Sequence, residues 1–477
     1  MVSENRKIPH AIANAKGLRD EDRHTIYDLY ALYEDKLTRN VLRDRYYNMK
    51  QRPQDLGIST PPKLRNLEQV VGWCAKSVNC LADRSIFDGF VAQSEDTLTQ
   101  LQQMTQRTNL KRKYRKAVIS ELKHSCSFVT VTKDEDQKAV ISVYPATASS
   151  ALWSDRLERI TAGMVVVDRD NTLHRRGIPT WVDVFTDDAI IEIRFIDRQW
   201  VAFYHEHDMG RCLMEALVYG ASLDRPFGKS RISRAVMNIT DSAMRASVRS
   251  EISAEFFTSP QKYLLGADKE ALEGQTKWDA YIGNIFCVSR RDDDVIPQFG
   301  QLSQATMQPH LDYIRALAMR FSGETNVPIC ELGVSYDNPT SSDAINAQHE
   351  PLVIEAQNLN ADNGYALSNV AIMALATEAN KDFKTMREEC LDVHPKFRNP
   401  SMPSPISQGD NLVKMSSALP FYAMSDVALE HSGFEDDDQQ RLRVDRRRYQ
   451  AQELATARFN EMSKAGTNGN AESTSAV

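Results

Sequence analysis

The stretch LDRPFGKSRI, residues 223–232, raises the question whether this chain has the fold of a nucleotide hydrolase. Its Gly228-Lys229-Ser230 matches the end of the phosphate-binding loop motif. The full motif is Gly-x-x-x-x-Gly-Lys-Ser/Thr, in which the first glycine lets backbone amides curl around the phosphates. The position of the first glycine holds Leu223, Gly220 lies three residues too early, and Pro226 removes one amide donor. No apolar strand ending in aspartate follows at a distance suited to hold magnesium. The stretch therefore argues against a nucleotide hydrolase.

The composition indicates a globular protein without a membrane segment. The chain has 477 residues, of which 42% are hydrophobic and 26% are charged, and this length predicts about two to four subdomains. Its first residues lack the apolar core of a signal peptide, and no stretch approaches the roughly 18 uncharged apolar residues of a membrane span. We therefore expect a protein that stays in the cytoplasm where it is made, with no membrane partner.

Charge and cysteine usage argue against two further classes. Seven cysteines are scattered without a CxxC pair, which favours buried thiols over a disulfide framework or a zinc knuckle. The formal net charge of -7 argues against a general nucleic-acid coat, because such proteins are normally basic.

The hydrophobic pattern changes from strand-like to helical near residue 230. Residues 20–50, 66–90 and 96–123 have helical patterns, whereas residues 126–207 contain several strand patterns. From residue 231 a broad stripe of apolar or small residues predicts a helix that ends at Ser259-Pro260. The stripe consists of Ile232, Val236, Ile239, Ala243, Ala246 and Ile252.

The second half of the chain is predicted to be mainly helical. Short strand-like pieces follow Pro260, and a second helix precedes residue 324. The next helical segment is long, and we expect Pro351 and Gly364 to bend or interrupt it. Prolines between residues 395 and 405 mark a boundary, beyond which we expect two or three helices and a disordered tail.

Segments spread over residues 40 to 460 resemble the portal proteins of tailed bacteriophages. Their order along the chain carries the resemblance more than any one of them does. They are YYNMKQRPQDLGI (46–58), NLEQVVGWCAKSVNCLADRSIFDGF (66–90), HDMGRCLMEALVYGASLDRPFGKSRI (207–232), DSAMRASVRSEISAEFFTSPQKYLLG (241–266), SGETNVPICELGVSYDNPTSSDAI (322–345), HPKFRNPSMPS (394–404) and KMSSALPFYAMSDVALEHSGF (414–434).

The resemblance gives another interpretation of the opening stretch. In this family the segment before the first stem helix typically reads Gly-x-Ser-Arg-Ile, which matches Gly228, Ser230, Arg231 and Ile232. It implies that the glycine and the serine form a turn that caps a helix beginning near Arg231. Lys229 is then an incidental surface residue.

The resemblance also implies the fold class and the domains. The fold is expected to be α+β, a mainly helical portal fold that assembles into a ring, with a β-rich wing, a helical stem, a small α/β clip and a helical crown. The implied wing comprises residues 1–230 and 341–400, the latter including a long kinked helix. The implied remaining parts are stem helices at 231–257 and 307–323, a clip at 258–306, a tunnel loop at 324–340, a crown at 401–464 and a disordered tail at 465–477.

The function implied by the resemblance is that of a portal. Such proteins form a ring, usually of about twelve subunits, at one vertex of the procapsid and the virion, and its channel passes double-stranded DNA during packaging and ejection. The large terminase subunit docks on the clip and hydrolyses ATP, and head-completion or tail adaptor proteins later take its place. The major capsid and scaffolding proteins are further expected partners, and assembly is expected in the host cytoplasm.

The channel residues are predicted from a long stretch of the sequence that lacks positively charged residues. No lysine or arginine occurs between Arg320 and Lys381, although eight acidic residues do. An ordinary acidic helix is one explanation. The other is a lining for a DNA channel, which must avoid the salt-dependent phosphate binding that lysine and arginine produce. We assign Glu324, Glu331, Asp337 and Asn338 to the DNA-facing tunnel loop, and Arg245 and Arg249 to the stem.

Other polar clusters have more ordinary explanations. His205 and His207 have a spacing that metal sites can use, but no third ligand is identifiable, and no Gly-x-Ser-x-Gly elbow occurs. The basic run at 107–116 is either a solvated helix face, which we prefer, or a contact for DNA or an acidic capsid surface. Residues 434–449 place acids before a helix and arginines along it, which suits the helix dipole or pairing with a neighbouring subunit. We expect no catalytic residue, no cofactor and no metal.

Two other functions remain alternatives to the portal. One is a phage DNA-processing enzyme, an ATPase or nuclease, against which the incomplete phosphate loop and the lack of an acidic metal cluster argue. The other is a capsid adaptor that forms a ring but passes no DNA.

Overall fold

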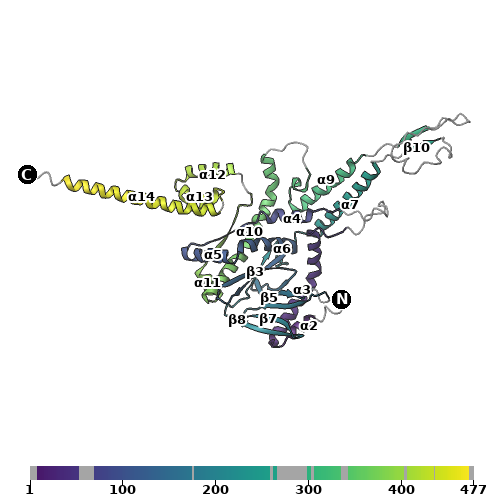
Figure 1. The fold of residues 1–477 in the computed structure, drawn as a ribbon, viewed down its shortest axis with the longest axis horizontal. Helices are drawn as coiled ribbons and strands as arrows, with labels where there is room; N and C mark the ends of the chain where they lie inside the picture. The colour runs from purple at the N-terminus through teal and green to yellow at the C-terminus, as the bar shows by residue number, and fades with distance from the viewer. Residues whose placement is uncertain are drawn as a thin grey trace, which may run out of the picture. The chain divides into compact units, whose positions relative to one another are not determined.

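A computed structural model describes most of the chain (Figure 1). The described residues are 8–52, 69–173, 177–257, 262–265, 298–301, 306–334, 342–401, 405–434 and 436–471. They divide into two compact units, Met1–Pro400 and Ser401–Val477. Most of the predicted clip and the second half of the predicted tunnel loop, including Asp337 and Asn338, lie outside the described residues.

The first unit begins with helices and continues with a strand-rich region. The elements are α2 (Ile8–Ala13), α3 (Asp20–Tyr47), α4 (Trp73–Ala82), β1 (Phe87–Val91), α5 (Glu95–Arg107), α6 (Leu110–His124), β2 (Cys126–Lys133), β3 (Ala139–Pro145), β4 (Ser149–Ser154), β5 (Arg159–Arg169), β6 (Pro179–Phe185), β7 (Ala189–Ile196), β8 (Gln199–Glu206) and β9 (Met214–Val218). Strands β2 to β8 lie where the sequence predicts β structure, between residues 126 and 207, whereas β1 and β9 lie outside that range.

Two antiparallel sheets form the centre of this unit. Strands β4 to β8 are neighbours in sequence order and form a five-stranded sheet, while β3, β2 and β9 form a three-stranded sheet in that order. Alternate residues of β5, β6 and β7, such as Met164, Val182 and Ile191, point into one core with α2 and α3. Nearly all of β2 is buried, because α6 and α10 both pack against the smaller sheet.

The rest of the first unit is mainly helical. Its elements are α7 (Arg234–Phe257), β10 (Lys262–Leu265), β11 (Gln298–Gln301), α9 (Gln308–Thr325), the 3-10 helix η3 (Ile329–Leu332), α10 (Ser342–Ala379), α11 (Phe383–Glu389) and β12 (His394–Phe397). Helices α7 and α9 pack against each other (Figure 1). They are antiparallel, since Arg231, just before α7, contacts Thr325 at the end of α9. The predicted apolar stripe of α7 is confirmed, because all six of its residues are buried.

Helix α10 differs from the prediction because it runs without interruption through Pro351 and Gly364. Burial of Leu352, Val353 and many later apolar residues along α10 offsets the one hydrogen bond that a proline cannot donate. Gly364 faces β12, since a Cβ there would make an ordinary contact with the Pro395 side chain at 3.4 Å. Of the two predicted alternatives, interruption is therefore wrong, and the bend stays a prediction.

The second unit is helical. It contains α12 (Pro405–Ala418), the 3-10 helix η4 (Tyr422–Met424), α13 (Asp426–His431) and α14 (Asp436–Ala471). The side chain of Ser425 caps α13 by accepting a hydrogen bond from the Ala428 amide at 3.2 Å. Helix α14 continues to Ala471, so the predicted disordered tail is wrong for residues 465–471; residues 472–477 lie outside the described part.

Candidate functional site at the base of the α7–α9 pair

The Gly-Lys-Ser stretch forms a packing turn after β9. Gly228 has a φ of 65°, and a Cβ there would lie 2.2 Å from the Tyr219 carbonyl oxygen, so only glycine fits. The Lys229 amide donates to the same oxygen at 3.0 Å, and the Ser230 hydroxyl donates to the Lys123 carbonyl at 2.5 Å. The backbone and the serine are thus engaged within the chain, and Lys229 is exposed. The predicted turn and the exposed lysine are confirmed.

Helix α7 begins later than the sequence predicts. It starts at Arg234, and its cap is Ser233, whose hydroxyl accepts a hydrogen bond from the Val236 amide at 3.2 Å. Ser230 Oγ accepts from the amide of Ile232 at 3.0 Å, which closes a local turn before the helix. The expected start near Arg231 is wrong, because Arg231 has a different role.

Arg231 is a buried hub for four segments. Its side chain is 2% exposed, and it forms an ion pair with Glu355 of α10. Nε donates to the Ser77 carbonyl of α4 at 2.8 Å, Nη1 also donates to the Tyr219 hydroxyl at 3.1 Å, and Nη2 donates to the Thr325 carbonyl of α9. One planar guanidinium therefore joins α4, the end of β9, α9 and α10.

The sequence could not reveal this hub. A lone arginine after a turn is normally an exposed residue, and its acceptors lie between 12 and 154 positions away. The available signal was the Gly-x-Ser-Arg-Ile motif, which includes Arg231 but says nothing of its contacts. Burial of the tyrosine hydroxyl in the same cluster raises the pKa of Tyr219 to about 12.

The predicted channel residues are only partly brought together. Glu324 lies on the last turn of α9 and is exposed. Glu331 lies in η3 and forms an ion pair with Lys76 of α4 at 2.6 Å. The hydrogen bond from Lys76 holds the pKa of the Glu331 carboxyl below its usual range. Arg245 on α7 is half-buried and donates to the Ser242 hydroxyl at 3.1 Å, whereas Arg249 is exposed.

Several acids in the stretch without lysine or arginine, residues 321–380, pair with basic residues from elsewhere in the chain. Basic residues from other segments pair with three of its eight acids: Lys76 with Glu331, Arg231 with Glu355 and Arg107 with Glu378. Sequence distance hid these pairs. Among the described residues, Glu324 is the exposed acid of the α9 end with no ion pair.

The basic run at 107–116 is accounted for mainly by contacts within the chain. Besides Arg107, Arg115 pairs with Asp83 at 2.9 Å, and Lys113 donates to the Ile141 carbonyl at 2.5 Å. Arg112 and Lys116 are exposed on α6. These contacts support the preferred interpretation as a solvated helix face.

The two histidines near the end of β8 have separate surroundings. His205 is exposed and lies 3.4 Å from the Glu192 carboxylate, whereas the ring of His207 faces the Met209 amide at 3.4 Å. Burial lowers the pKa of His207. Within the described ranges no group of three or more histidine, cysteine, aspartate or glutamate side chains is placed to hold a metal ion.

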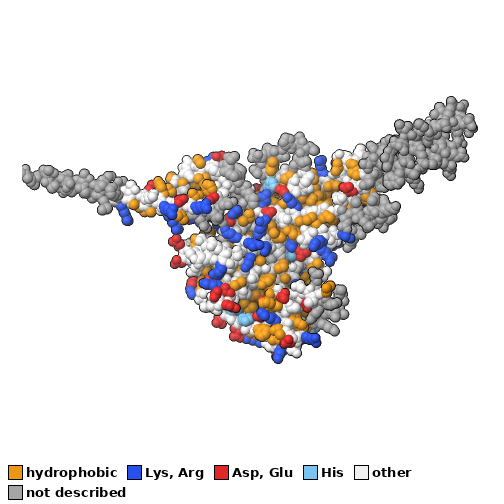
Figure 2. All heavy atoms as spheres, viewed as in Figure 1, with side chains coloured by type: hydrophobic (Ala, Val, Ile, Leu, Met, Phe, Trp, Pro, Cys, Tyr) orange, Lys and Arg blue, Asp and Glu red, His pale blue; other side chains and the backbone are white. Residues whose placement is uncertain are grey.

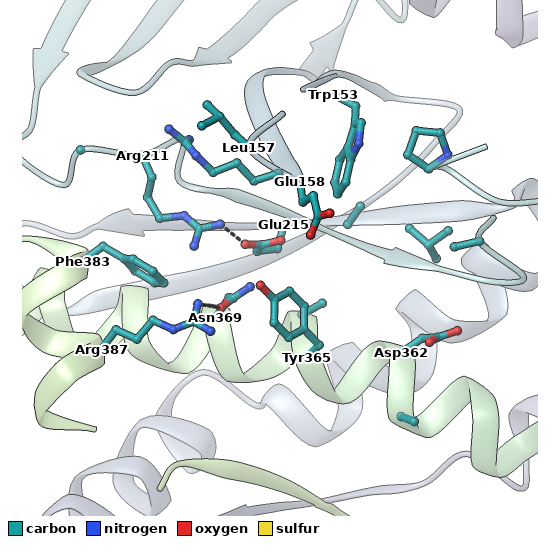
Figure 3. Close-up of a pocket in the computed structure, with 18 residues that line it drawn as sticks. Trp153, Leu157, Glu158, Arg211, Glu215, Asp362, Tyr365, Asn369, Phe383 and Arg387 are labelled. Atoms are coloured by element: carbon teal, nitrogen blue, oxygen red, sulfur yellow. Dashed lines mark hydrogen bonds and ion pairs between the residues drawn. The ribbon is translucent and has the colours of Figure 1, made fainter. Parts of the chain in front are cut away.

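A cavity of about 520 Å³ opens between β9, α10 and α11 (Figure 3). Within its lining Arg211 pairs with the Glu215 carboxylate, and Arg387 donates to the Asn369 side-chain oxygen at 3.1 Å. The Arg211 guanidinium also lies 4.2 Å from the centre of the Phe383 ring, which adds a cation–π contact. The described lining residues include no serine, cysteine or histidine. The arrangement is that of a buried ion pair beside a surface cavity.

A second buried carboxyl joins α6 to α10. Glu121 has no exposed surface, and its Oε2 accepts from Asn363 Nδ2 at 2.9 Å. Glu121 Oε1 and Asn363 Oδ1 are buried acceptors without a hydrogen-bond partner among the described residues. Burial raises the pKa of Glu121 to about 8. A protonated carboxyl has the donor that these two oxygens lack, which agrees with the raised pKa of Glu121.

Large apolar side chains are exposed on both units. On α9 they are Leu311, Tyr313 and Met319, and hydrophobic side chains are visible at the surface over this region (Figure 2). In the second unit they include Val413, Phe421 and Leu454. In that unit the arginines of α14 pair within the chain: Arg443 lies 3.5 Å from Glu430, and Arg446 pairs with Asp426.

Comparison with known proteins decides the family. A family model described as "Phage portal protein, SPP1 Gp6-like" matches residues 19–454. The chain belongs to the phage portal protein family. Its role is that of a phage portal, so the prediction of an α+β portal fold is confirmed. The family is structural, which removes the support for a DNA-processing enzyme as the alternative.

Curated portal proteins from two phages are similar over most of the chain. The portal protein of Mycobacterium phage L5 is 23% identical over 404 residues, and that of Mycobacterium phage D29 is 23% identical over 403 residues. Each match covers 81% of this chain and 81% of the relative.

Solved structures of gene transfer agent (GTA) particles are also similar. The neck of a native particle computed with C12 symmetry matches with a TM-score of 0.44 and 12% identity, covering 84% of this chain and 92% of that chain. The neck of an empty particle computed with C6 symmetry matches with a TM-score of 0.45 and 13% identity, covering 80% of this chain and 90% of that chain.

In the described part of this chain no helix is long and apolar enough to span a membrane.

Proposed function

We propose that about twelve copies of this portal protein form a ring at one vertex of the procapsid, and that double-stranded DNA passes through its central channel during packaging and ejection. The exposed large apolar side chains of α9 and of the second unit support this proposal, because burying apolar surface favours association between copies. Neighbouring copies would cover these side chains.

The proposed partners follow from the portal role. The large terminase subunit docks on the clip and hydrolyses ATP, so the portal protein itself has no enzymatic activity. Head-completion or tail adaptor proteins later occupy the same end, and the major capsid and scaffolding proteins contact the ring during assembly in the host cytoplasm. The turn at Gly228-Lys229-Ser230 supports the absence of nucleotide hydrolysis, since the amides of Gly228 and Lys229 and the hydroxyl of Ser230 form hydrogen bonds within the chain.

In this proposal α7 and α9 form the stem, residues 258–306 form the clip, and residues 401–464 form the crown. The tunnel loop at 324–340 lies closest to the DNA. The proposed DNA-facing residues of this loop are acidic or neutral, so they offer no positive charge to the DNA phosphates. They are Glu324, Glu331, Asp337 and Asn338. The observation that carries the assignment is exposed Glu324 at the end of α9, where the stretch without lysine or arginine begins.

The variant Glu324→Lys tests this assignment. Because Glu324 forms no ion pair among the described residues, the substitution breaks none of them. In a ring of about twelve subunits it turns about a dozen negative charges positive, and each new bond to a phosphate adds close to one unit to the salt slope of binding. We expect rings to assemble normally but packaging to slow or stall at low salt. Packaging should recover partly near 0.1 M salt, where screening shortens the reach of the charges to about 10 Å.

Asp136→Lys is the matched control, because Asp136 is an exposed acid in the turn between β2 and β3. It makes the same charge change away from α9 and should leave packaging unaffected. If Glu324→Lys rings package full-length DNA at the unmodified rate at low salt, Glu324 does not face the DNA. A ring that never passes DNA under any salt condition would instead indicate the adaptor without a channel.

A further inference from the structure

The buried ion pair of Arg231 and Glu355 joins the two ends of a segment that carries three of the four proposed channel residues, Glu331, Asp337 and Asn338. Helix α9 ends at Thr325, and Glu355 lies within α10, so residues 326–354 connect these two points in the chain. Arg231 contacts both of them: Nη1 pairs with Glu355, and Nη2 donates to the Thr325 carbonyl. The two points are therefore held together by a residue outside the segment.

The Thr325 contact uses the physical chemistry of a helix end. The last carbonyls of a helix have no donor within the helix, and the C-terminus carries the negative end of the helix dipole. Asn326, the next residue, turns the chain with a φ of 54°, and its Nδ2 donates to Glu355 Oε2 at 3.3 Å. The arginine thus satisfies the helix end while the asparagine ties the first loop residue to the same carboxylate.

The geometry requires an arginine. A charge whose side chain is only 2% exposed is costly unless its donors all have acceptors, and here all three guanidinium nitrogens have one. The fork is rigid, so the directions of its acceptors on α4, α9 and α10 are fixed relative to one another. A lysine could reach one or two of these acceptors but could not fix all of them.

Helix α4 holds the same segment at a second point. Its Ser77 carbonyl accepts from Arg231, and the neighbouring Lys76 pairs with Glu331 of η3. Trp73 of α4 also packs on Phe321 of α9, with ring centroids 5.4 Å apart. The described part of the loop, residues 326–334, is therefore attached to α4 and α10 rather than to α9 alone.

We propose that Arg231 and Glu355 are positioning residues, a clamp that fixes residues 326–334 relative to α4 and α10. This role rests on the proposed function in one respect: these residues belong to the loop that faces the DNA. Without the clamp the helix pair α7–α9 still folds through its apolar stripe, but the loop loses its fixed position.

Hydrogen exchange in assembled rings tests the clamp. The Glu331 and Gly333 amides donate to Pro328 and Cys330 at 3.0 and 3.2 Å, so they report on the order of this segment. In Arg231→Met rings we expect exchange across 326–334 to be roughly tenfold faster, because buried acceptors lose their donors. Tyr219→Phe, which removes only the hydroxyl bonded to both Arg231 and Glu355, is a milder second variant that should show a smaller increase.

Arg211→Met is the matched control. Arg211 and Glu215 form another buried ion pair in the same unit, with side chains 8% and 9% exposed, but they do not contact residues 326–334. The control should lower the unfolding temperature without increasing exchange in that segment. Unchanged exchange at 326–334 in both Arg231→Met and Tyr219→Phe rings would overturn the clamp, and so would an equal increase in Arg211→Met rings.

DNA packaging by the same rings separates the clamp from the proposed function. Slower packaging by Arg231→Met rings, with control rings unaffected, is expected if the clamp positions a DNA-facing loop. Faster exchange with unchanged packaging would leave the clamp in place and overturn the assignment of residues 326–334 to the DNA-facing loop.

Discussion

The two compact units of this portal protein differ in how much apolar surface each buries within itself. In the first unit, residues up to 400, buried charges such as Arg231 and Arg211 have carboxylate partners in the same chain. In the second unit, from residue 401, large apolar side chains are exposed: Val413 by 68%, Phe421 by 71% and Leu454 by 64%. Both units expose apolar side chains, but the first also has two large buried cores, whereas Tyr422 and Ala428 are the buried apolar side chains among the described residues of the second.

The difference shows where a ring would contribute to stability. Burying apolar surface contributes roughly 25 cal/mol per Å², and neighbouring copies can supply that burial for the second unit. Substitutions in the first unit should therefore change the stability of each subunit. Substitutions on the exposed apolar surface of the second unit should change assembly instead.

The largest expected effect is that of Ala243→Pro in α7. Ala243 is buried in the middle of the helix, where a proline removes a hydrogen bond and clashes with the preceding turn at a cost of about 3 kcal/mol or more per subunit. Arg234→Pro is the control, because proline is tolerated in the first turn of a helix. Light scattering should show rings for the control alone, and normal rings from Ala243→Pro would rule out α7 as a continuous stem helix.

The next effect has the opposite sign and depends on pH. Because the pKa of Glu121 is raised to about 8 in the folded protein, its contribution to stability is complete below about pH 4.5 and is lost as pH rises toward 8. Glu121→Gln, which keeps the donor without a titratable proton, should raise the unfolding free energy by roughly 2–3 kcal/mol at pH 7 and by almost nothing at pH 4. Denaturant unfolding at both pH values measures this, and an equal effect at both would contradict a neutral buried acid.

A smaller effect on folding is expected for Phe421→Ser in the second unit. Removing an exposed ring should change subunit stability by less than about 0.5 kcal/mol, yet it should shift the equilibrium from rings to monomers. Phe185→Ser is the contrast in the first unit, since Phe185 is 1% exposed and its loss costs about 3 kcal/mol or more. Mass photometry measures assembly and thermal unfolding measures stability. If Phe421→Ser lowered stability and left assembly unchanged, the exposed apolar surface of the second unit would not be an assembly surface.

The smallest expected effect is that of Lys229→Ala. Lys229 is exposed on a turn whose shape depends on Gly228 and Ser230, so ring assembly and stability should be unchanged. The purified protein should release no phosphate from ATP before or after the change. Phosphate release that the substitution abolishes would show that the turn is a nucleotide site.

Local patterns in the sequence predicted the fold wherever one face of an element is buried. The α7 stripe and the strands at 126–207 were found because helical and strand periodicities are local properties. The continuity of α10 through Pro351 and Gly364 was not found, because tertiary packing outweighs a local preference. The start of α7 was placed too early for a related reason: Arg231 follows the turn but bonds to distant segments instead of entering the helix.

The candidate site was less predictable than the fold. The sequence placed Glu324 and Glu331 in one loop but could not show that Lys76 neutralises Glu331. Pairing between residues far apart in sequence depends on the completed fold, and no local pattern encodes it. The same reason explains why Arg231 was predicted to begin a helix rather than to join four segments.

Electron microscopy of the purified full-length protein tests the central claim most directly. Class averages should show closed rings with a central hole, because the exposed apolar side chains of α9 and of the second unit are covered only when copies associate. Particles that remain monomeric at every concentration, or closed rings without a central opening, would contradict a DNA-conducting portal.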